Sequence, residues 1–177
     1  MKSPRWVIVG LLVAFAAGTG CFSTIASKKK SKNAATLRIY KQTSKSLPRG
    51  YRSQIVFERP AITFWVDPAP ELSERDIVSL ETVEGGSGLK IKITFNAHGR
   101  FVLENLTGGN RGKYMAVVAG GATITRPIAA IRMNEIIRDG VLIFTPDLTD
   151  EQIVTFVAEL QKGIGQIKKQ DSFNFKP

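Results

Sequence analysis

Few residues in this sequence have side chains suited to catalysis or to metal binding. His98 is the only histidine of the 177-residue chain, and Cys21 is the only cysteine. Because zinc sites combine several histidine, cysteine or carboxylate ligands at short spacings, one histidine without clustered acids does not predict a metal centre. Asn96-Ala97-His98-Gly99 is instead typical of a helix start, where a polar side chain caps free backbone N–H groups. We therefore expect no metal site and no cofactor.

One segment, Gly108-Gly109-Asn110-Arg111-Gly112-Lys113, has the composition of a phosphate-binding loop. A phosphate loop follows a strand and opens a helix, whereas this segment closes a predicted helix and precedes a predicted strand. It is therefore interpreted as a connecting loop. The adjacent acids Asp150 and Glu151 suit the positive end of a helix dipole and need no catalytic role. No nucleophile motif such as Gly-x-Ser-x-Gly occurs, so the sequence predicts no catalytic residues and no enzyme.

The cysteine has a position suited to lipid attachment. Two basic residues precede an apolar run, Trp6 to Ala17, and three small residues then lead to Cys21. This order is typical of a secretory signal, and the run is too short for a comfortable membrane span. It resembles the bacterial lipoprotein signal, although Gly18 stands where that family usually has leucine. Two alternatives stay open, namely cleavage after Ala26 and an uncleaved N-terminal anchor.

The net charge of +10 comes from one part of the chain. Eleven basic residues and no acid lie between Met1 and Phe57, whereas 14 basic and 15 acidic residues follow from Glu58 onward. Because the remainder is nearly neutral and the basic part has few aromatics, we do not expect nucleic-acid binding. Residues 21–52 read as a basic flexible tether. The tether contains a cluster of four lysines: Lys28, Lys29, Lys30 and Lys32. Either these lysines contact anionic lipid headgroups, or the segment is a solvated spacer.

The hydrophobic pattern alternates between strand and helix periods. Leu89, Ile91, Ile93 and Phe95 alternate with polar residues, as in a half-buried strand. Further runs predict strands at 53–57, 62–66, 77–83, 114–119, 122–125 and 141–144, and residues 37–40 form a short strand or helix. Spacings of three and four residues predict a helix at 99–106, ended by Thr107-Gly108-Gly109.

The last helix is the best specified element. Thr149 and Gln152 form a capping-box pattern, and Leu148 and Ile153 can make the accompanying hydrophobic staple. One apolar stripe then continues to Ile164. With one sheet face buried beneath two such helices, the pattern predicts an α+β sandwich with an antiparallel or mixed sheet of about five strands and both helices on one face.

We divide the chain into five segments. Residues 1–20 form a lipoprotein-type signal peptide, 21–52 the tether, 53–70 extended edge strands with a Pro-rich linker, 71–169 the α+β domain and 170–177 a loose tail. Four side chains are candidates for a contact surface: Phe64, Trp65, Arg111 and Arg126. For Phe64 and Trp65, packing in the core is the competing interpretation, since aromatics stabilise mainly by burial. A strand edge at 114–119 or 122–125 is a further candidate, as a place for strand addition by a peptide.

Ordered motifs from about Asp67 to Lys169 are similar to one known family. In the first half, an acidic segment precedes a strand at Pro70 to Ile77. A strand is followed by a glycine and a helix at Phe95-Asn96-Ala97-His98-Gly99, and that helix ends in Leu106-Thr107. The second half contains an Ala-rich strand ending in Gly-Gly, a proline step, and the final helix, in the segments Tyr114 to Gly121, Thr125-Arg126-Pro127-Ile128, Asp139-Gly140, Phe144-Thr145 and Asp150-Glu151 to Gly163. Together they resemble the head subdomain of the first periplasmic domain of SecD and SecDF protein-export subunits.

The resemblance implies a ferredoxin-like head and an extracytoplasmic module that engages exported polypeptides. It does not extend to the proton-coupled membrane part of those proteins, because nothing after Cys21 approaches a membrane span. Pro127 also follows an arginine where the family usually has alanine.

We therefore expect a non-enzymatic, extracytoplasmic module that a lipid anchors to a membrane of a bacterial envelope, on the periplasmic side in a Gram-negative cell. Its partner would be an exported polypeptide or an envelope protein. Two alternatives remain: an envelope hydrolase or small-ligand-binding lipoprotein with a site built from loops, and a structural subunit that self-associates through its sheet edges.

Overall fold

The structure is a computed structural model that describes residues 35–86, 88–121 and 123–174. These residues form eight strands and two α-helices. The strands are β1 (Thr36–Lys41), β2 (Ser53–Phe57), β3 (Ile62–Val66), β4 (Ile77–Gly85), β5 (Gly88–Phe95), β6 (Tyr114–Gly120), β7 (Arg126–Arg132) and β8 (Val141–Phe144). The helices are α1 (Ala97–Gly109) and α2 (Asp150–Asn174), and short 3-10 turns occur at η1 (Arg49–Tyr51) and η2 (Glu74–Asp76).

The strands form three antiparallel sheets, in the orders β1-β6-β7, β2-β3 and β4-β5-β8. The α+β class is confirmed, but the strands are not joined in one sheet of about five. The physical reason lies in β6, where the successive residues Met115, Ala116 and Val117 are all buried. A strand buried on both faces needs a packed layer on each side of its sheet. The prediction placed both helices on one face of a single sheet and left the other face in solvent.

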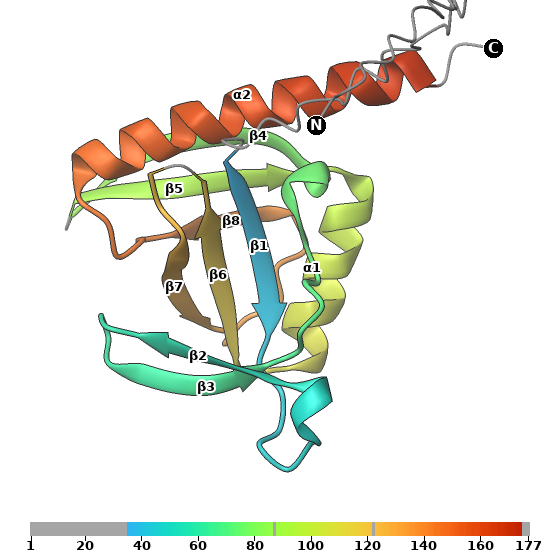
Figure 1. The fold of residues 1–177 in the computed structure, drawn as a ribbon, viewed down its shortest axis with the longest axis vertical. Coiled ribbons are helices and arrows are strands. Elements are labelled where there is room, and N and C mark those ends of the chain that lie inside the picture. The colour runs from blue at the N-terminus through green and yellow to red at the C-terminus, as the bar shows by residue number, and fades with distance from the viewer. Residues whose placement is uncertain (1–34, 87, 122, 175–177) are drawn as a thin grey trace, which may run out of the picture. The chain divides into compact units, whose positions relative to one another are not determined.

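The main core lies between the sheet β1-β6-β7, the sheet β4-β5-β8 and both helices. Alternate residues of β5, among them Ile91 and Ile93, point into it, and Phe156 and Leu160 enter from α2. Figure 1 shows α2 running along β4, so that the helix lies at the outer edge of that sheet. The helix thus covers the core where the sheet ends.

The hairpin β2-β3 covers the other face of the sheet β1-β6-β7 (Figure 1). Phe57, Phe64 and Val66 of the hairpin pack against Ala116 of β6. Phe64 also stacks between Phe57 and Tyr114, with ring centroids 5.4 and 5.5 Å apart. Residues 53–66 therefore belong to the folded domain and do not form a separate edge segment in front of it.

Strand β1 corrects the predicted tether. Ala35, Leu37 and Ile39 are buried, and β1 pairs with β6 along its whole length. The backbone of Ile39 also bonds to Leu72 and Glu71 on its other side. Residues 36–40 alternate between buried and more exposed positions, so of the strand and the helix left open for 37–40 the strand is the one that forms. The basic segment before the hairpin therefore contains an integral strand.

The strand predicted at 122–125 is wrong, because the structure places β7 at Arg126–Arg132 and no strand at the described residues 123–125. Pro127, read as the end of a strand, lies inside β7. This is tolerated because β7 is an edge strand, where a residue without an N–H group costs no ladder bond. The register shift at Val117/Val118 lies opposite this position.

Both helices begin as predicted. The Asn96 side chain accepts a hydrogen bond from the Gly99 N–H at 2.8 Å, and Thr149 and Gln152 bond reciprocally at 3.3 and 3.1 Å. Gly99 is required by packing, since a Cβ there would lie 3.0 Å from side chains of Asp76 and Phe95. Helix α2 continues to Asn174, into the segment predicted as a loose tail.

The lipidation site Cys21 and the cations Lys28, Lys29, Lys30 and Lys32 lie outside the described residues. Within the described ranges, neither helix is both long enough and apolar enough to cross a membrane.

Candidate functional site

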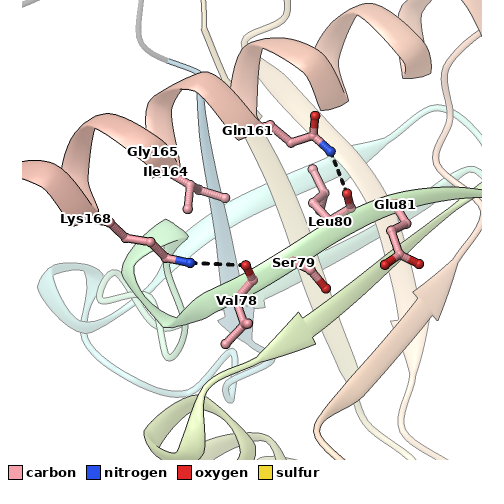
Figure 2. A pocket seen from close by; sticks show the side chains of 8 residues that line it. All are labelled: Val78, Ser79, Leu80, Glu81, Gln161, Ile164, Gly165 and Lys168. Carbon is pink, nitrogen blue, oxygen red and sulfur yellow. Dashed lines mark hydrogen bonds between the residues drawn. The ribbon is translucent and has the colours of Figure 1, made fainter.

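A groove runs between β4 and α2 and is the best candidate for a binding site in the described part of the chain. Figure 2 shows one half of it, a hollow of about 410 Å³ whose walls are residues 78–81 of β4 and Gln161, Ile164, Gly165 and Lys168 of α2. A second hollow of about 390 Å³ shares Leu80, Glu81 and Gln161 with the first and continues to Thr82 and Val154. The two hollows thus form one groove along the strand, and Gln161 lies where they meet.

One wall of the groove is the free edge of a sheet. β4 pairs with β5 on one side only, and no other strand in the described ranges pairs with its outer edge. The Leu80 carbonyl points away from β5, toward α2. In an antiparallel strand the N–H and C=O groups of one residue point to the same side, so the Leu80 N–H also faces the groove. Unpaired edges of this kind are templates for pairing with another chain.

Side chains of α2 cover two carbonyls of this edge. Gln161 Nε2 donates to the Leu80 carbonyl at 2.8 Å, and Lys168 Nζ donates to the Val78 carbonyl at 3.2 Å (Figure 2). Both donors sit at the ends of long side chains that are largely exposed to solvent. These bonds satisfy two carbonyls of the strand edge, and side-chain rotation alone can break them.

The helix wall includes two small residues, Ala158 and Gly165, among longer ones. Val154, Ala158, Gln161, Gly165 and Lys168 recur at spacings of three and four, so they share one stripe of α2 beside the buried stripe. Nothing lies within 4 Å of the position that a Cβ on Gly165 would occupy. The space in the groove therefore follows from a methyl group at 158 and a hydrogen at 165.

The predicted contact surface of Phe64, Trp65, Arg111 and Arg126 is not a single surface. Phe64 is only 5% exposed and belongs to the core, which removes it from any surface role. Trp65, on the opposite face of β3, lies under the Arg52 guanidinium, 4.0 Å from its ring centroid. The competing interpretation, packing, therefore holds for Phe64.

The two arginines lie at opposite ends of β7. Arg126 begins the strand and pairs with Asp147 through Nη1 at 3.0 Å, and its Nη2 donates to the Asp147 carbonyl. Arg111 lies in the loop after α1 and donates to the Asn134 carbonyl at 3.4 Å, beyond the end of β7. The Gly108–Lys113 segment is a connector, as predicted, since it joins the end of α1 to β6.

His98 is held by a neighbouring acid. Its Nδ1 lies 2.9 Å from Asp76 Oδ1, while Asp76 Oδ2 accepts bonds from the Ser73 N–H and hydroxyl. The carboxylate stands between the hydroxyl and the imidazole, so serine and histidine do not touch as a nucleophile and its base must. This cluster caps η2 at the start of β4. Within the described ranges, no three acids, cysteines or histidines are grouped to hold a metal.

The sequence predictions missed both walls of the groove. Strand addition was expected at 114–119 or at 122–125. The first is β6, the central strand of its sheet, and the described residues 123–125 of the second form no strand. The signal for α2 was present in the sequence, because the stripe beside the core stripe carries Ala158 and Gly165 seven residues apart. The free edge of β4 had no such signal, since strand order is not encoded in a local pattern.

No family model and no curated protein matches the chain. Two solved structures are similar in fold. One comes from a study of the structure and function of a membrane component, SecDF, that enhances protein export; it is 17% identical, with a TM-score of 0.54 over 75% of this chain and 64% of that chain. The other is a crystal structure of SecDF in a super-membrane-facing form, 20% identical, with a TM-score of 0.55 over 75% of this chain and 19% of that chain.

The chain has a SecD-like fold. It spans less than two thirds of the first SecDF chain and about one fifth of the second. Identities of 17% and 20% establish a likeness of fold alone. The SecD-like part of the resemblance found in the sequence is thereby confirmed, while its assignment to the head subdomain and the lipoprotein signal stay predictions.

Proposed function

We propose that this chain is a non-enzymatic, extracytoplasmic module of protein export that binds extended polypeptide segments in the groove between β4 and α2. A lipid on Cys21 would hold it at the membrane, with Lys28, Lys29, Lys30 and Lys32 near the headgroups. The observation that carries the proposal is the free outer edge of β4, whose carbonyls face an open groove. The likeness to SecDF supports the connection with protein export.

The groove suits a polypeptide backbone better than a compact ligand. Its strand wall runs from Val78 to Thr82, and five residues in extended conformation span about 16 Å. Along that wall the groups facing the groove are backbone donors and acceptors, whose natural complement is the backbone of a second strand. Main-chain hydrogen bonds of this kind give affinity without requiring one particular sequence.

The other wall favours apolar side chains. A strand beside β4 would direct alternate side chains toward α2, where Val154, Val157 and Ile164 line the groove. The remaining side chains would point to solvent beside Glu81. We therefore expect a preference for segments in which apolar and polar residues alternate, as in polypeptides that have not yet folded.

Binding requires that two side chains move. An incoming backbone N–H would replace Gln161 Nε2 on the Leu80 carbonyl, and another would replace Lys168 Nζ on the Val78 carbonyl. Each exchange replaces one hydrogen bond by another, so the net gain comes from the apolar area covered and from backbone groups that lack a protein partner. Affinity is expected to be modest and release fast, which suits transient contact with a passing chain.

The test uses the full chain and a permanently unfolded probe, reduced and carboxymethylated lactalbumin carrying a fluorophore. Gly165→Leu fills the groove and replaces glycine by a better helix former, so the fold is retained. We expect binding about tenfold weaker, which equals about 1.4 kcal/mol. Gly109→Leu is the matched control, because Gly109 ends the other helix and also has open space around it. Equal affinities for Gly165→Leu and the parent chain would refute the proposal.

A further inference from the structure

The loop between β1 and β2 gathers exposed apolar and basic side chains at one end of the fold. We define the docking loop as residues 44–52, Ser-Lys-Ser-Leu-Pro-Arg-Gly-Tyr-Arg. Every residue from Ser44 to Tyr51 is exposed, and Tyr51 is 69% exposed. The groove between β4 and α2 does not include any residue of this loop.

The docking loop has a defined conformation. The Leu47 N–H donates to the Ser44 carbonyl at 3.4 Å, and the hydroxyls of Ser44 and Ser46 lie 2.7 Å apart. Pro48 then opens the turn η1, in which the Tyr51 N–H donates to the Pro48 carbonyl at 2.9 Å. The two backbone bonds shape the loop, in which Leu47 is 38% and Tyr51 69% exposed, so little further ordering of the backbone would be needed on contact with a partner.

The apolar part of the loop continues into a shallow hollow. Leu47, Pro48 and Tyr51 line it together with Pro68 and Ala69, and its volume is about 480 Å³. Single exposed apolar residues are ordinary on protein surfaces, but this group is contiguous. The acid that lines the hollow, Asp67, is engaged by the Ala69 N–H at 3.1 Å.

The loop carries cations and no acid within its own sequence, and one acid, Asp67, lines the hollow beside it. Lys45, Arg49 and Arg52 belong to residues 42–57, a stretch without aspartate or glutamate. In the described part of the chain, none of the three forms an ion pair, and Arg52 instead stacks on Trp65. Lys45 and Arg49 thus stand without an ion pair two residues to either side of Leu47, whereas the Arg52 guanidinium is turned to Trp65.

We propose that the docking loop contacts an anionic lipid surface. Lys45 and Arg49 bind headgroup phosphates, while Leu47 and Tyr51 enter the boundary between headgroups and acyl chains. This assignment follows from the two kinds of side chain in the loop. Cations complement the anionic headgroups, and aromatic and aliphatic side chains suit the boundary between headgroups and acyl chains. An acidic protein surface would complement the cations alone, whereas the lipid interface complements both the cations and the exposed side chains of Leu47 and Tyr51.

The test measures depth at the loop itself, so that any membrane affinity of the N-terminal segment does not interfere. The full chain carries Cys21→Ser and a single new cysteine, Ser46→Cys, labelled with an environment-sensitive fluorophore. A second protein carries the label at Thr155→Cys on the exposed face of α2. Both are mixed with phosphatidylcholine vesicles that contain or lack phosphatidylglycerol and that carry quenchers on the acyl chains.

We expect quenching of the label at position 46 on phosphatidylglycerol vesicles, none of the label at position 155, and loss of the signal at high salt. Arg49→Gln and Lys45→Gln should each weaken vesicle affinity about fivefold. Tyr51→Ser should abolish quenching, whereas Phe101→Ser, at an aromatic residue of α1 with 65% exposure, should not change it. No quenching at position 46, or equal quenching at positions 46 and 155, would overturn the proposal. Binding of polyglutamate that depends on Arg49, without quenching on vesicles, would assign the loop to an acidic protein instead.

Discussion

The side-chain amide of Gln161 donates a 2.8 Å hydrogen bond to the backbone carbonyl of Leu80, joining α2 to the outer edge of β4. Edge strands expose unpaired backbone groups and are liable to pair with other chains. Here two helix side chains, Gln161 and Lys168, bond to carbonyls that a neighbouring strand would otherwise pair. Gln161 therefore protects the edge and, in our proposal, also controls access to it.

Replacing Gln161 by alanine should open the groove. The Leu80 carbonyl would lose its partner, and the two hollows on either side of Gln161 would merge. We expect unfolding to become easier by about 1 kcal/mol. Affinity for the unfolded lactalbumin probe should rise up to about fivefold, because no cap has to be displaced. Denaturant titration and fluorescence anisotropy measure the two effects.

The control for this change is Gln166→Ala. Gln166 is exposed on another face of α2, and its side chain has no hydrogen bond within the described ranges. It should leave both stability and affinity as in the parent chain. If Gln161→Ala weakened polypeptide binding, Gln161 would be a ligand-contacting residue and its role as a displaceable cap would be wrong.

Phe64→Ala tests the reassignment of Phe64 from a surface residue to a core residue. Phe64 packs between Phe57 and Tyr114, and its removal leaves a cavity between the hairpin and β6. We expect a loss of about 3–5 kcal/mol in the free energy of unfolding. Phe101→Ala, at an exposed aromatic, should change stability by less than about 0.5 kcal/mol. Similar losses of stability for the two variants would show that Phe64 is not a core residue.

Local patterns predicted most of the elements of this fold. Strands β2, β3 and β8 have the predicted bounds, and the starts of both helices follow from side-chain capping at Asn96 and Thr149. These features depend on neighbours within a few residues. The position of β7 was predicted wrongly, because Pro127 locally indicates the end of a strand. An edge strand tolerates a proline inside it. At β1 the sequence left a strand or a helix open for residues 37–40, because the alternation there is short and lies in a segment rich in cations.

The arrangement of the sheets could not be predicted in the same way. Whether β4 or β6 has a free edge depends on which strands pair, and those partners lie far apart in the chain, as Leu37 and Ala119 do. The candidate groove could not be predicted for the same reason, because one of its walls is a strand edge. The helix wall could have been predicted from the sequence, since the seven-residue spacing of Ala158 and Gly165 places both on one stripe of α2.

Lipid attachment at Cys21 is a prediction from the sequence that mass spectrometry of the mature protein can check. We expect an N-terminal peptide that begins at Cys21 and carries a diacylglyceryl group. Cys21→Ser should prevent lipidation and reduce the protein in the membrane fraction. A peptide that begins at Ser27 without acyl mass would show that the signal is cut elsewhere. In that case the docking loop would remain as an independent route to the membrane.

Thr107 should contribute to stability through its hydroxyl. The side chain is fully buried, its Oγ1 donates to the Leu103 carbonyl at 2.8 Å and accepts from the Ile137 N–H at 3.0 Å. The second bond ties the end of α1 to the segment that leads into β8. Thr107→Val keeps the shape but leaves the Ile137 N–H without an acceptor, which should cost about 1–3 kcal/mol.

Thr107→Ser separates this effect from packing, because serine keeps the hydroxyl and removes only the methyl group. We expect a loss of about 1 kcal/mol for the serine variant, close to the value of one buried methyl group. Amide hydrogen exchange at Ile137 should accelerate in the valine variant and remain slow in the serine variant. If both variants lost the same stability and exchanged alike, the bond from Ile137 would not hold the segment. The difference between them therefore measures what a single buried hydroxyl contributes to joining α1 to β8.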